Sequence, residues 1–188
     1  MSVCPKSNDH ETISVGTPLG THTNSIIPTM ETAMQQIETL GLSLACPPAP
    51  VANYVPAMIC GNTLITSGQI PLKDGQLLYK GEVPSCQSME DAVSAAKQCG
   101  LNALAVAAAA LDGDINRIKR VLQLRVFIAA DAGFEGHSTV ADGASHLMVE
   151  VFGEHGKHTR IAVGSSGLPL GATVEVEAMF ELHEPVSA

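Results

Sequence analysis

The amino-acid sequence predicts an α/β fold of the α+β sandwich type, in which two helices cover one face of a mostly antiparallel sheet. The first reason is the order of the apolar patterns along the chain, which is strand, strand, strand, helix, strand, helix, strand, strand. The second is the last of these strands, 174–182, where apolar residues on one face alternate with three glutamates and a methionine on the other. Such alternation is typical of a sheet that is covered on one side only.

Length and composition favour a single domain. The chain has 188 residues, 45% of them hydrophobic but only 3% aromatic, so we expect an aliphatic core that is rich in alanine. Charged residues make up 15%, below the usual proportion of about a quarter, and burial in an oligomer would explain this. Residues 1–28, rich in Ser, Thr, Pro and Gly, are expected to form a flexible N-terminal extension, and residues 29–188 the domain.

The first predicted element is a short helix that begins after Thr29, a good N-cap residue, and ends before the glycine at 41. A Pro-rich segment, 46–50, then fixes an extended connection into the rest of the domain. Two short strands are predicted next, one on each side of the turn signal Gly61-Asn62.

The middle of the chain is predicted to hold a third short strand, at 76–80, and a long helix. Ser88 opens this helix, because its hydroxyl and Asp91 in the first turn resemble a capping arrangement, and the helix runs to about Leu111. Its many alanines imply close packing against the sheet. A strand follows at 118–130, where apolar residues alternate.

The last part of the chain is predicted to contain a helix within 139–156 and then a hairpin within 158–182. The helix stops at one of the glycines near its end. The two strands of the hairpin flank the turn sequence SSGLPLG. This arrangement puts Arg160 and Glu175 at mirrored positions about the turn.

The charge of the chain weighs against nucleic-acid and membrane partners. The formal net charge is −9, and the ten Lys and Arg residues are scattered, apart from one group at 117–120 that we interpret as a solvated helix end. Phosphate backbones are bound mainly through such cations. The apolar run at 101–111 is too short to span a bilayer. We therefore expect no nucleic-acid partner and no membrane partner.

Five cysteines, an odd number without any C-x-x-C, favour reduced thiols over disulfides or a zinc site. The N-terminus lacks the pattern of a secretory or mitochondrial signal, so a cytoplasmic location is expected. Four of the seven histidines form a group between 137 and 158 without a metal-binding motif, and we interpret them as exposed loop residues. They are His137, His146, His155 and His158. No metal ligand is assigned.

Two groups of residues suggest a ligand site. Arg160 could grip a carboxylate at two points, and Glu175 could orient or deprotonate a water molecule. On spacing alone, an ion pair across the hairpin is the favoured interpretation, and hydrolysis of a small carboxylate is the alternative. Ser67 and Gly68 could supply a hydroxyl and a close-approaching backbone N–H beside a ligand, or form a bulge.

Four segments carry a resemblance to a known family. They are NYVPA at 53–57, ITSGQIP at 65–71, RVLQLRVFIAA at 120–130 and TRIAVGSSGLPLGATVEVEA at 159–178. The last is the most specific, because it combines R-x-x-V with L-P and V-E-V-E in one arrangement. Together the segments resemble the RidA/YjgF/YER057c group, also called the L-PSP endoribonuclease family, in a longer subgroup.

The resemblance implies a chorismate-mutase-like fold that assembles as a homotrimer with three ligand clefts between subunits. It also implies hydrolysis of reactive enamine and imine acids, such as 2-aminoacrylate, to 2-oxo acids and ammonia, as a form of metabolite damage control. No metal or organic cofactor is implied. The partner of the protein would then be a small carboxylate or imine substrate.

The resemblance also implies roles for particular residues. Arg160 would bind the substrate carboxylate, and Glu175 would position the attacking water. Asp142 would replace an asparagine of the cleft, and this anion could repel a carboxylate substrate or select a more cationic one. The remaining residues that would line the cleft are Tyr54, Ser67, Gly68 and Ala162, the last standing where the archetypes usually have cysteine.

Two other functions stay open at this point. A trimer with the same clefts could bind small carboxylates without turning them over. Endoribonuclease activity, which one name of the family suggests, is disfavoured by the acidic charge and by the lack of interleaved aromatic and basic residues.

Overall fold

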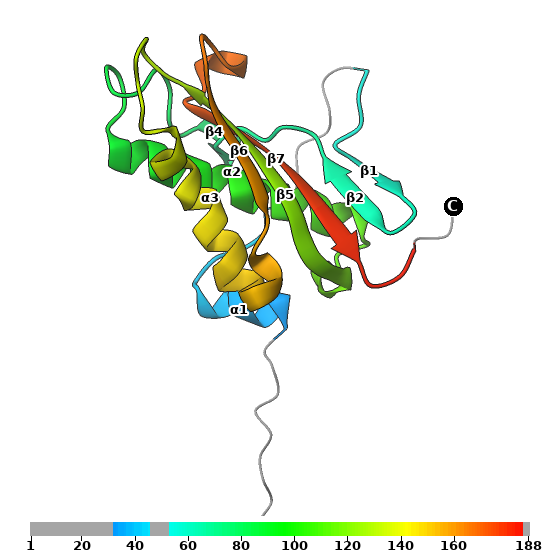
Figure 1. Cartoon of the computed structure of the whole chain (residues 1–188). Helices are drawn as coiled ribbons and strands as arrows, with labels where there is room; N and C mark the ends of the chain where they lie inside the picture. Colours follow the sequence, from blue (N-terminus) through cyan, green and yellow to red (C-terminus); the bar gives the residue numbers. More distant parts are fainter. Residues whose placement is uncertain (1–31, 46–52, 186–188) are drawn as a thin grey trace, which may run out of the picture. The chain divides into compact units, whose positions relative to one another are not determined.

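The structure of the protein is a computed structural model that describes residues 32–45 and 53–185 (Figure 1). These residues belong to one compact unit. The predicted extension at 1–28 and the Pro-rich connection at 46–50 lie outside the described residues, so the division of the chain at residue 28 stays a prediction.

Helix α1 spans Ala33–Thr39, and its N-cap is Thr32 rather than Thr29, which is itself outside the described residues. The Thr32 hydroxyl accepts a hydrogen bond from the backbone of Gln35, whose side chain accepts one from the backbone N–H of Thr32. This reciprocal capping box satisfies two donors at the start of the helix, which a cap three residues earlier could not reach. Gly41 follows the helix with a positive φ of 68°.

Helix α2 spans Met89–Ala110 and confirms the long predicted helix. Its N-cap is Ser88, whose Oγ accepts a hydrogen bond from the Asp91 backbone at 3.0 Å, as the sequence suggested. Helix α3 spans His137–Phe152 and ends at Gly153, close to the predicted bounds. Figure 1 shows α2 and α3 side by side on the same side of the sheet, and α1 packs against α3.

The main sheet has five strands in the order β1-β2-β7-β5-β6. Their bounds are Ala57–Cys60, Thr63–Thr66, Val174–Leu182, Ile118–Ala129 and Thr159–Ser165 in that order. All neighbours are antiparallel except β5 and β6, which are parallel. The mostly antiparallel sheet and the helix layer on one face confirm the predicted mixed α and β architecture, with α1 as a third helix.

Two short strands form a separate small sheet. They are β3, Leu72–Lys73, and β4, Gln76–Leu77. Asp74 and Gly75 make the turn between them, and both have positive φ. The strand that the sequence predicted at 76–80 is therefore shorter than expected and does not join the main sheet.

The closing hairpin that the sequence predicted is wrong. Strand β5 lies between β6 and β7, so these two consecutive strands never pair. Strand β5 is 12 residues long and pairs with β7 on one side and with β6 on the other. Helix α3 provides the crossover that a parallel β5–β6 pair requires. The turn-like sequence between β6 and β7 therefore does not make these two strands pair. Instead, each of them pairs with one of the two long edges of β5.

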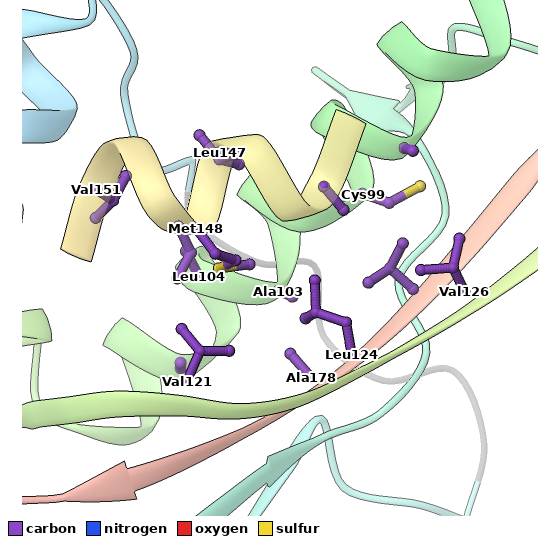
Figure 2. Packing of buried hydrophobic residues seen from close by; sticks show 14 of the residues in the cluster. Cys99, Ala103, Leu104, Val121, Leu124, Val126, Leu147, Met148, Val151 and Ala178 are labelled. Atoms are coloured by element: carbon purple, nitrogen blue, oxygen red, sulfur yellow. The ribbon is translucent and has the colours of Figure 1, made fainter. Parts of the chain in front are cut away.

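The core fills the space between the helices and the inner face of the sheet (Figure 2). Helix α2 contributes small residues there, including Cys99 and Ala103, and this lets the helix approach β7 and β2 closely. Leu104, Leu124 and Met148 fill the gaps, and all three are fully buried. Among residues 32–45 and 53–185, the helix layer thereby leaves the opposite, outer face of the sheet uncovered.

The register of β7 separates the two faces residue by residue. Val176 and Ala178 are buried and stand opposite Val126 and Leu124 of β5 on the inner face. Glu175 and Glu177 stand opposite Phe127 and Arg125 on the outer face. The predicted alternation of this strand is therefore confirmed.

Candidate functional site

Arg160 lies on the inner face of edge strand β6, at the level of Leu124 of β5. Its Nη1 donates to Asp142 Oδ1 at 2.7 Å and to Ser145 Oγ at 3.0 Å. Asp142 and Ser145 are three residues apart on α3, which places both on the side of the helix that faces β6. The guanidinium is thus held by two side chains of one helical turn.

His158 continues this network at the start of β6. Its Nε2 lies 3.1 Å from Ser145 Oγ, and its Nδ1 lies 2.6 Å from the carbonyl oxygen of Gly156. Burial lowers the pKa of His158 below its usual value, the hydrogen bond to Gly156 opposes this effect, and the charge of Arg160 adds to the lowering. The imidazole is therefore neutral at neutral pH.

A pocket of about 380 Å³ opens beside these groups. Its lining consists of Ser145, Val149, Lys157, His158 and Arg160. Two cations, a neutral imidazole and a hydroxyl converge on one small volume, which is the composition expected for a site that binds a small anion. We define these residues together with Asp142 as the Arg160 pocket.

Glu175 belongs to a different environment on the outer face. A Cβ added at Gly68 would collide with Glu175 Oε1, so only glycine at 68 allows this carboxylate its position. Burial, and to a smaller extent the neighbouring Glu177, raises the pKa of Glu175. The Gly68 backbone therefore lies close to Glu175. The predicted approach of its N–H to a ligand stays a prediction.

Tyr54 shortly precedes β1 and Ser67 directly follows β2, so both lie at the open end of the β1–β2 hairpin. Ser67 Oγ donates to the Val55 carbonyl at 2.7 Å, and its backbone N–H donates to Pro56. Tyr54, next to Val55, is half exposed. We group Tyr54, Ser67, Gly68 and Glu175 as the Glu175 cluster.

The Arg160 pocket and the Glu175 cluster do not meet within one chain. Arg160 stands at the level of Leu124 on the inner face, whereas Glu175 stands opposite Phe127 on the outer face, two strands away. The ion pair across a hairpin, predicted between Arg160 and Glu175, is therefore wrong. The carboxylate that pairs with Arg160 is Asp142.

Ala162 lies two residues beyond Arg160 on β6 and faces the same side, opposite Val126. Its side chain is half-buried and packs against the core. Ala162 therefore belongs with the Arg160 pocket rather than with the Glu175 cluster, although it does not line the pocket itself.

The histidines differ from the prediction that all four are exposed loop residues. His137 and His146 lie on helix α3, and only His155 is an exposed residue of a turn, in the 3-10 segment Gly153–Gly156. His158 is half-buried, and Gly156 and Ser145 hold both of its ring nitrogens.

Across 32–45 and 53–185, no group of histidine, cysteine and acidic side chains is arranged to hold a metal ion.

A second pocket, of about 430 Å³, lies where the parallel strands β5 and β6 end. Two of its polar side chains, Asp131 and His137, make contacts within the fold. Asp131 accepts hydrogen bonds from the backbone and the hydroxyl of Ser85, and His137 packs edge-on against Phe134 with ring centres 5.1 Å apart. The Arg160 pocket, with its converging cations, is therefore the better candidate site although it is the smaller of the two.

Sequence reasoning missed Ser145 and His158. A serine inside a helix and a histidine 13 residues later form no short motif. Two residue spacings in the sequence could have indicated that Ser145 and His158 lie near Asp142 and Arg160. His158 and Arg160 are two apart at the start of a strand, which is the spacing of one strand face, and Asp142 and Ser145 are three apart on one helix face.

Comparison with known proteins identifies the fold class and the family of this chain. The family described as YjgF/chorismate mutase-like, putative endoribonuclease, matches residues 35–182. The chain belongs to this family, and its α+β fold is the one that the sequence resemblance predicted. Between them, 32–45 and 53–185 include no helix that is both long enough and apolar enough to cross a membrane.

Three relatives illustrate the similarity. Protein TCP17 of Trypanosoma cruzi is 40% identical over 148 residues, which covers 78% of this chain and 92% of that protein. The crystal structure of Atu1372 of Agrobacterium tumefaciens, a protein of unknown function, is 39% identical with a TM-score of 0.75, covering 80% and 92% of the two chains. A putative endoribonuclease from Shewanella oneidensis MR-1 is 33% identical with a TM-score of 0.78, covering 81% and 100%.

Proposed function

We propose that the protein hydrolyses small enamine and imine acids of the 2-aminoacrylate type to 2-oxo acids and ammonia. The observation that carries this proposal is the Arg160 pocket, where a guanidinium is fixed at the rim of a small cationic cavity beside a neutral imidazole. Membership of the YjgF family is consistent with it. The reaction adds water to a C=N carbon and expels ammonia, so it needs proton transfer and a carboxylate anchor.

Arg160 is proposed as the carboxylate anchor. Only its Nη1 is engaged by Asp142 and Ser145, and the other guanidinium N–H groups make no hydrogen bond to any part of the chain that the structure describes. A planar guanidinium can therefore present a second edge to a carboxylate while α3 holds the first. Asp142 lowers the net charge of the pocket but fixes the orientation of Arg160.

We propose further that a homotrimer completes the site. The Arg160 pocket and the Glu175 cluster lie on opposite faces of one sheet, so a cleft between two subunits is the arrangement that would let both act on one substrate. Glu175 and Gly68 of one subunit, with Ser67 and Tyr54 at the rim, would then face Arg160 of a neighbouring subunit. In that cleft Glu175 would position the attacking water.

The test of this function is an assay that generates the imine acid in place. A pyridoxal-phosphate-dependent dehydratase supplies 2-aminoacrylate from serine, and the formation of 2-oxo acid is followed with and without the protein. Arg160→Ala should lower kcat/KM by about a hundredfold or more, because a charge-assisted two-point contact is lost. Arg160→Lys should restore the activity only in part, since an ammonium lacks the planar fork.

Arg120→Ala is the matched control, because Arg120 is an exposed arginine of β5 that pairs, within the described part of the chain, only with the Glu181 carboxylate at 3.7 Å. It should retain wild-type activity. If Arg160→Ala is fully active but melts at a lower temperature, the Arg160–Asp142 pair is structural and the assignment of the anchor is wrong.

A non-catalytic binder of small carboxylates is the second candidate, because the same cationic pocket would serve it. Calorimetry with a 2-oxo acid distinguishes the two. Binding that depends on Arg160, in a protein that never accelerates imine hydrolysis, would favour the binder. Endoribonuclease activity, stated in the description of the family, is tested by RNA cleavage that persists through extensive purification.

A further inference from the structure

We infer that Ser145 and His158 form the proton-transfer pair of the Arg160 pocket, in which the Ser145 hydroxyl contacts the attacking water and passes a proton to His158. This inference rests on the proposed function and names residues that the family resemblance does not assign. Three features of the structure support it: the directions of four hydrogen bonds, the pocket that Ser145 lines, and the separation of Glu175 from that pocket.

The directions of the hydrogen bonds follow from the chemistry of the groups. The Gly156 carbonyl can only accept, so His158 Nδ1 carries the hydrogen that spans the 2.6 Å contact. In a neutral ring Nε2 is then an acceptor, and the Ser145 hydroxyl must donate to it across 3.1 Å. Arg160 Nη1 can only donate, so Ser145 Oγ accepts from it at 3.0 Å.

This chain of donors polarises the Ser145 hydroxyl from both sides. Its hydrogen points to a base, and its oxygen faces a guanidinium that stabilises negative charge. Asp142 holds the same Nη1 from the other side at 2.7 Å, which keeps the guanidinium in place when the proton moves. The arrangement is that of a base whose orientation is fixed by a third group, here a backbone carbonyl.

The charges around His158 favour its neutral, proton-accepting form. Burial lowers the pKa of His158, the hydrogen bond to Gly156 partly opposes this, and Arg160 on β6 lowers the pKa further. Lys157 adds a second cation at the pocket, although Glu154 pairs with it at 2.8 Å. From α3, Asp142 faces the network but is paired with Arg160. A neutral imidazole is therefore available as a base at neutral pH.

The proposed step balances without any further reactant. Water attacks the imine carbon, a C–O bond forms, and the electron pair of the C=N bond moves to nitrogen. The water proton passes to Ser145 Oγ while the Ser145 proton passes to His158 Nε2. His158 returns this proton through Ser145 to the nitrogen, which gives a neutral carbinolamine. The hydroxyl proton of the carbinolamine then passes along the same route to nitrogen while the C=O bond forms and the C–N bond breaks, so both water protons end on nitrogen and ammonia and the 2-oxo acid leave.

Glu175 is poorly placed for this proton transfer. It lies on the outer face of the sheet, two strands from Arg160, and no basic side chain of the described chain forms an ion pair with it. In the proposed trimer it would reach the substrate from the neighbouring subunit and position the water. The inference therefore divides two roles, so that Glu175 orients the water and Ser145 with His158 moves the proton.

The experiment compares the dependence of kcat on pH for wild-type protein and four variants in the dehydratase-coupled assay. His158→Gln should lower kcat by about a hundredfold and remove the loss of activity on the acid side, because no imidazole is left to be protonated. Ser145→Ala should lower kcat at least about tenfold with little change in KM, since the anchor remains. Glu175→Gln should lower kcat but keep the acid-side loss.

His155→Gln is the matched control, because His155 is an exposed histidine three residues before His158 and lies outside the pocket. It should match the wild type. The melting temperature of every variant shows whether it is folded, and Ser145→Ala, which keeps a good helix former on α3, tests the pair even if His158→Gln fails to fold.

Three outcomes would overturn the inference. One is a His158→Gln protein with nearly wild-type kcat and an unchanged acid side. Another is a Glu175→Gln protein that alone loses the acid-side dependence, since that would make Glu175 the base. A wild-type protein that releases no ammonia from any imine acid would overturn the proposed function together with the inference, and this result is distinct from the other two.

Discussion

Single residues in the Arg160 pocket are bound to one another before any ligand arrives. The Arg160–Asp142 pair is partly exposed, with 25% and 44% of the two side chains accessible, so it contributes about 1 kcal/mol or less to stability. Its larger effect is on the orientation of the guanidinium. An arginine whose rotamer is already fixed loses less entropy when a carboxylate binds.

The charge of Asp142 is expected to weaken carboxylate binding. Asp142→Asn keeps an oxygen that accepts from Arg160 Nη1 but removes the anion, so KM for the imine acid should fall several-fold with kcat nearly unchanged. Steady-state kinetics at constant ionic strength measures this. Asp112→Asn, which makes the same change of charge in an exposed turn, should leave KM unaffected. A higher KM in Asp142→Asn would mean that the full charge is needed to hold Arg160.

His158 should make stability fall as the solution becomes acidic. Its pKa is lowered in the folded protein, so between that value and the ordinary value of about 6.5 the unfolded chain binds a proton that the folded chain does not. The stability contributed by the neutral ring is present above about pH 6.5 and is lost as the pH falls through this window.

Melting temperatures from about pH 7.5 to about pH 5 measure this effect as the difference between wild type and His158→Gln. The difference is needed because Glu175, with its raised pKa, acts in the opposite direction. The loss of stability on the acid side should be smaller in His158→Gln, whereas His155→Gln should follow the wild type. Parallel curves for wild type and His158→Gln would contradict the lowered pKa.

At the level of elements, the packing of α2 against α3 depends on a glycine. A Cβ added at Gly143 of α3 would collide with the carbonyl oxygen of Val93 on α2 and lie 3.2 Å from the Lys97 backbone nitrogen. Both obstacles are backbone atoms of a helix, which cannot rotate away. Gly100 of α2 differs, because its added Cβ would meet the flexible end of Leu147 at 3.3 Å.

Gly143→Ala should therefore destabilise the protein by about 1–3 kcal/mol, despite the better helix propensity of alanine. Gly100→Ala is the matched substitution on the facing helix and should change stability by less than about 1 kcal/mol, because the gain in propensity offsets the tighter contact. Chemical denaturation at one fixed protein concentration measures both. Equal effects would show that the helices separate easily.

The sequence predicted those elements whose signals are local. The Ser88 cap and the alanine stripe defined α2, and Gly61-Asn62 defined the β1–β2 hairpin, because capping and turn chemistry act over a few residues. The pairing of β6 could not be predicted in this way. Whether β6 joins β5 or β7 depends on contacts across the crossover α3, and local alternation is the same for both partners.

The candidate site was predictable to a similar extent. Arg160 and Asp142 were assigned from the family resemblance, and the structure brings them together. Ser145 and His158 were not, because their contact joins the middle of a helix to the start of a strand. The placement of Arg160 and Glu175 on opposite faces was not predicted, because the sequence interpretation wrongly paired β6 with β7.

At the level of the whole molecule, the outer face of the sheet exposes several apolar side chains. Met58 is 63% exposed, Ile161 46% and Val163 41%, on the strands at the two edges of the sheet. The register places Met58 opposite Ile65 and Val163 opposite Phe127 on this face. An apolar surface spread over the sheet is typical of a face that another subunit covers.

The proposed homotrimer should be the species found in solution, and Ile161→Lys should weaken it by placing a charge on this apolar face. Light scattering at micromolar concentration measures the mass of both proteins. Ser94→Lys, an exposed position on α2 in the helix layer, should leave the assembly unchanged. A wild-type mass equal to one chain of 19.5 kDa would remove the shared cleft from the proposed function.

Strand β6 lies at the edge of the sheet and is hydrogen-bonded to a strand on one side only. Elements of this kind open locally at a lower free energy than central strands do. Because Arg160 lies on β6 and His158 precedes it, such an opening would take the pocket apart while β5 and β7 stay paired. Backbone amides of β6 should therefore exchange with deuterium faster than those of β7.

On warming, the enzymatic activity should disappear at a temperature some degrees below the melting of the core, and a bound 2-oxo acid should reduce the difference between the two temperatures.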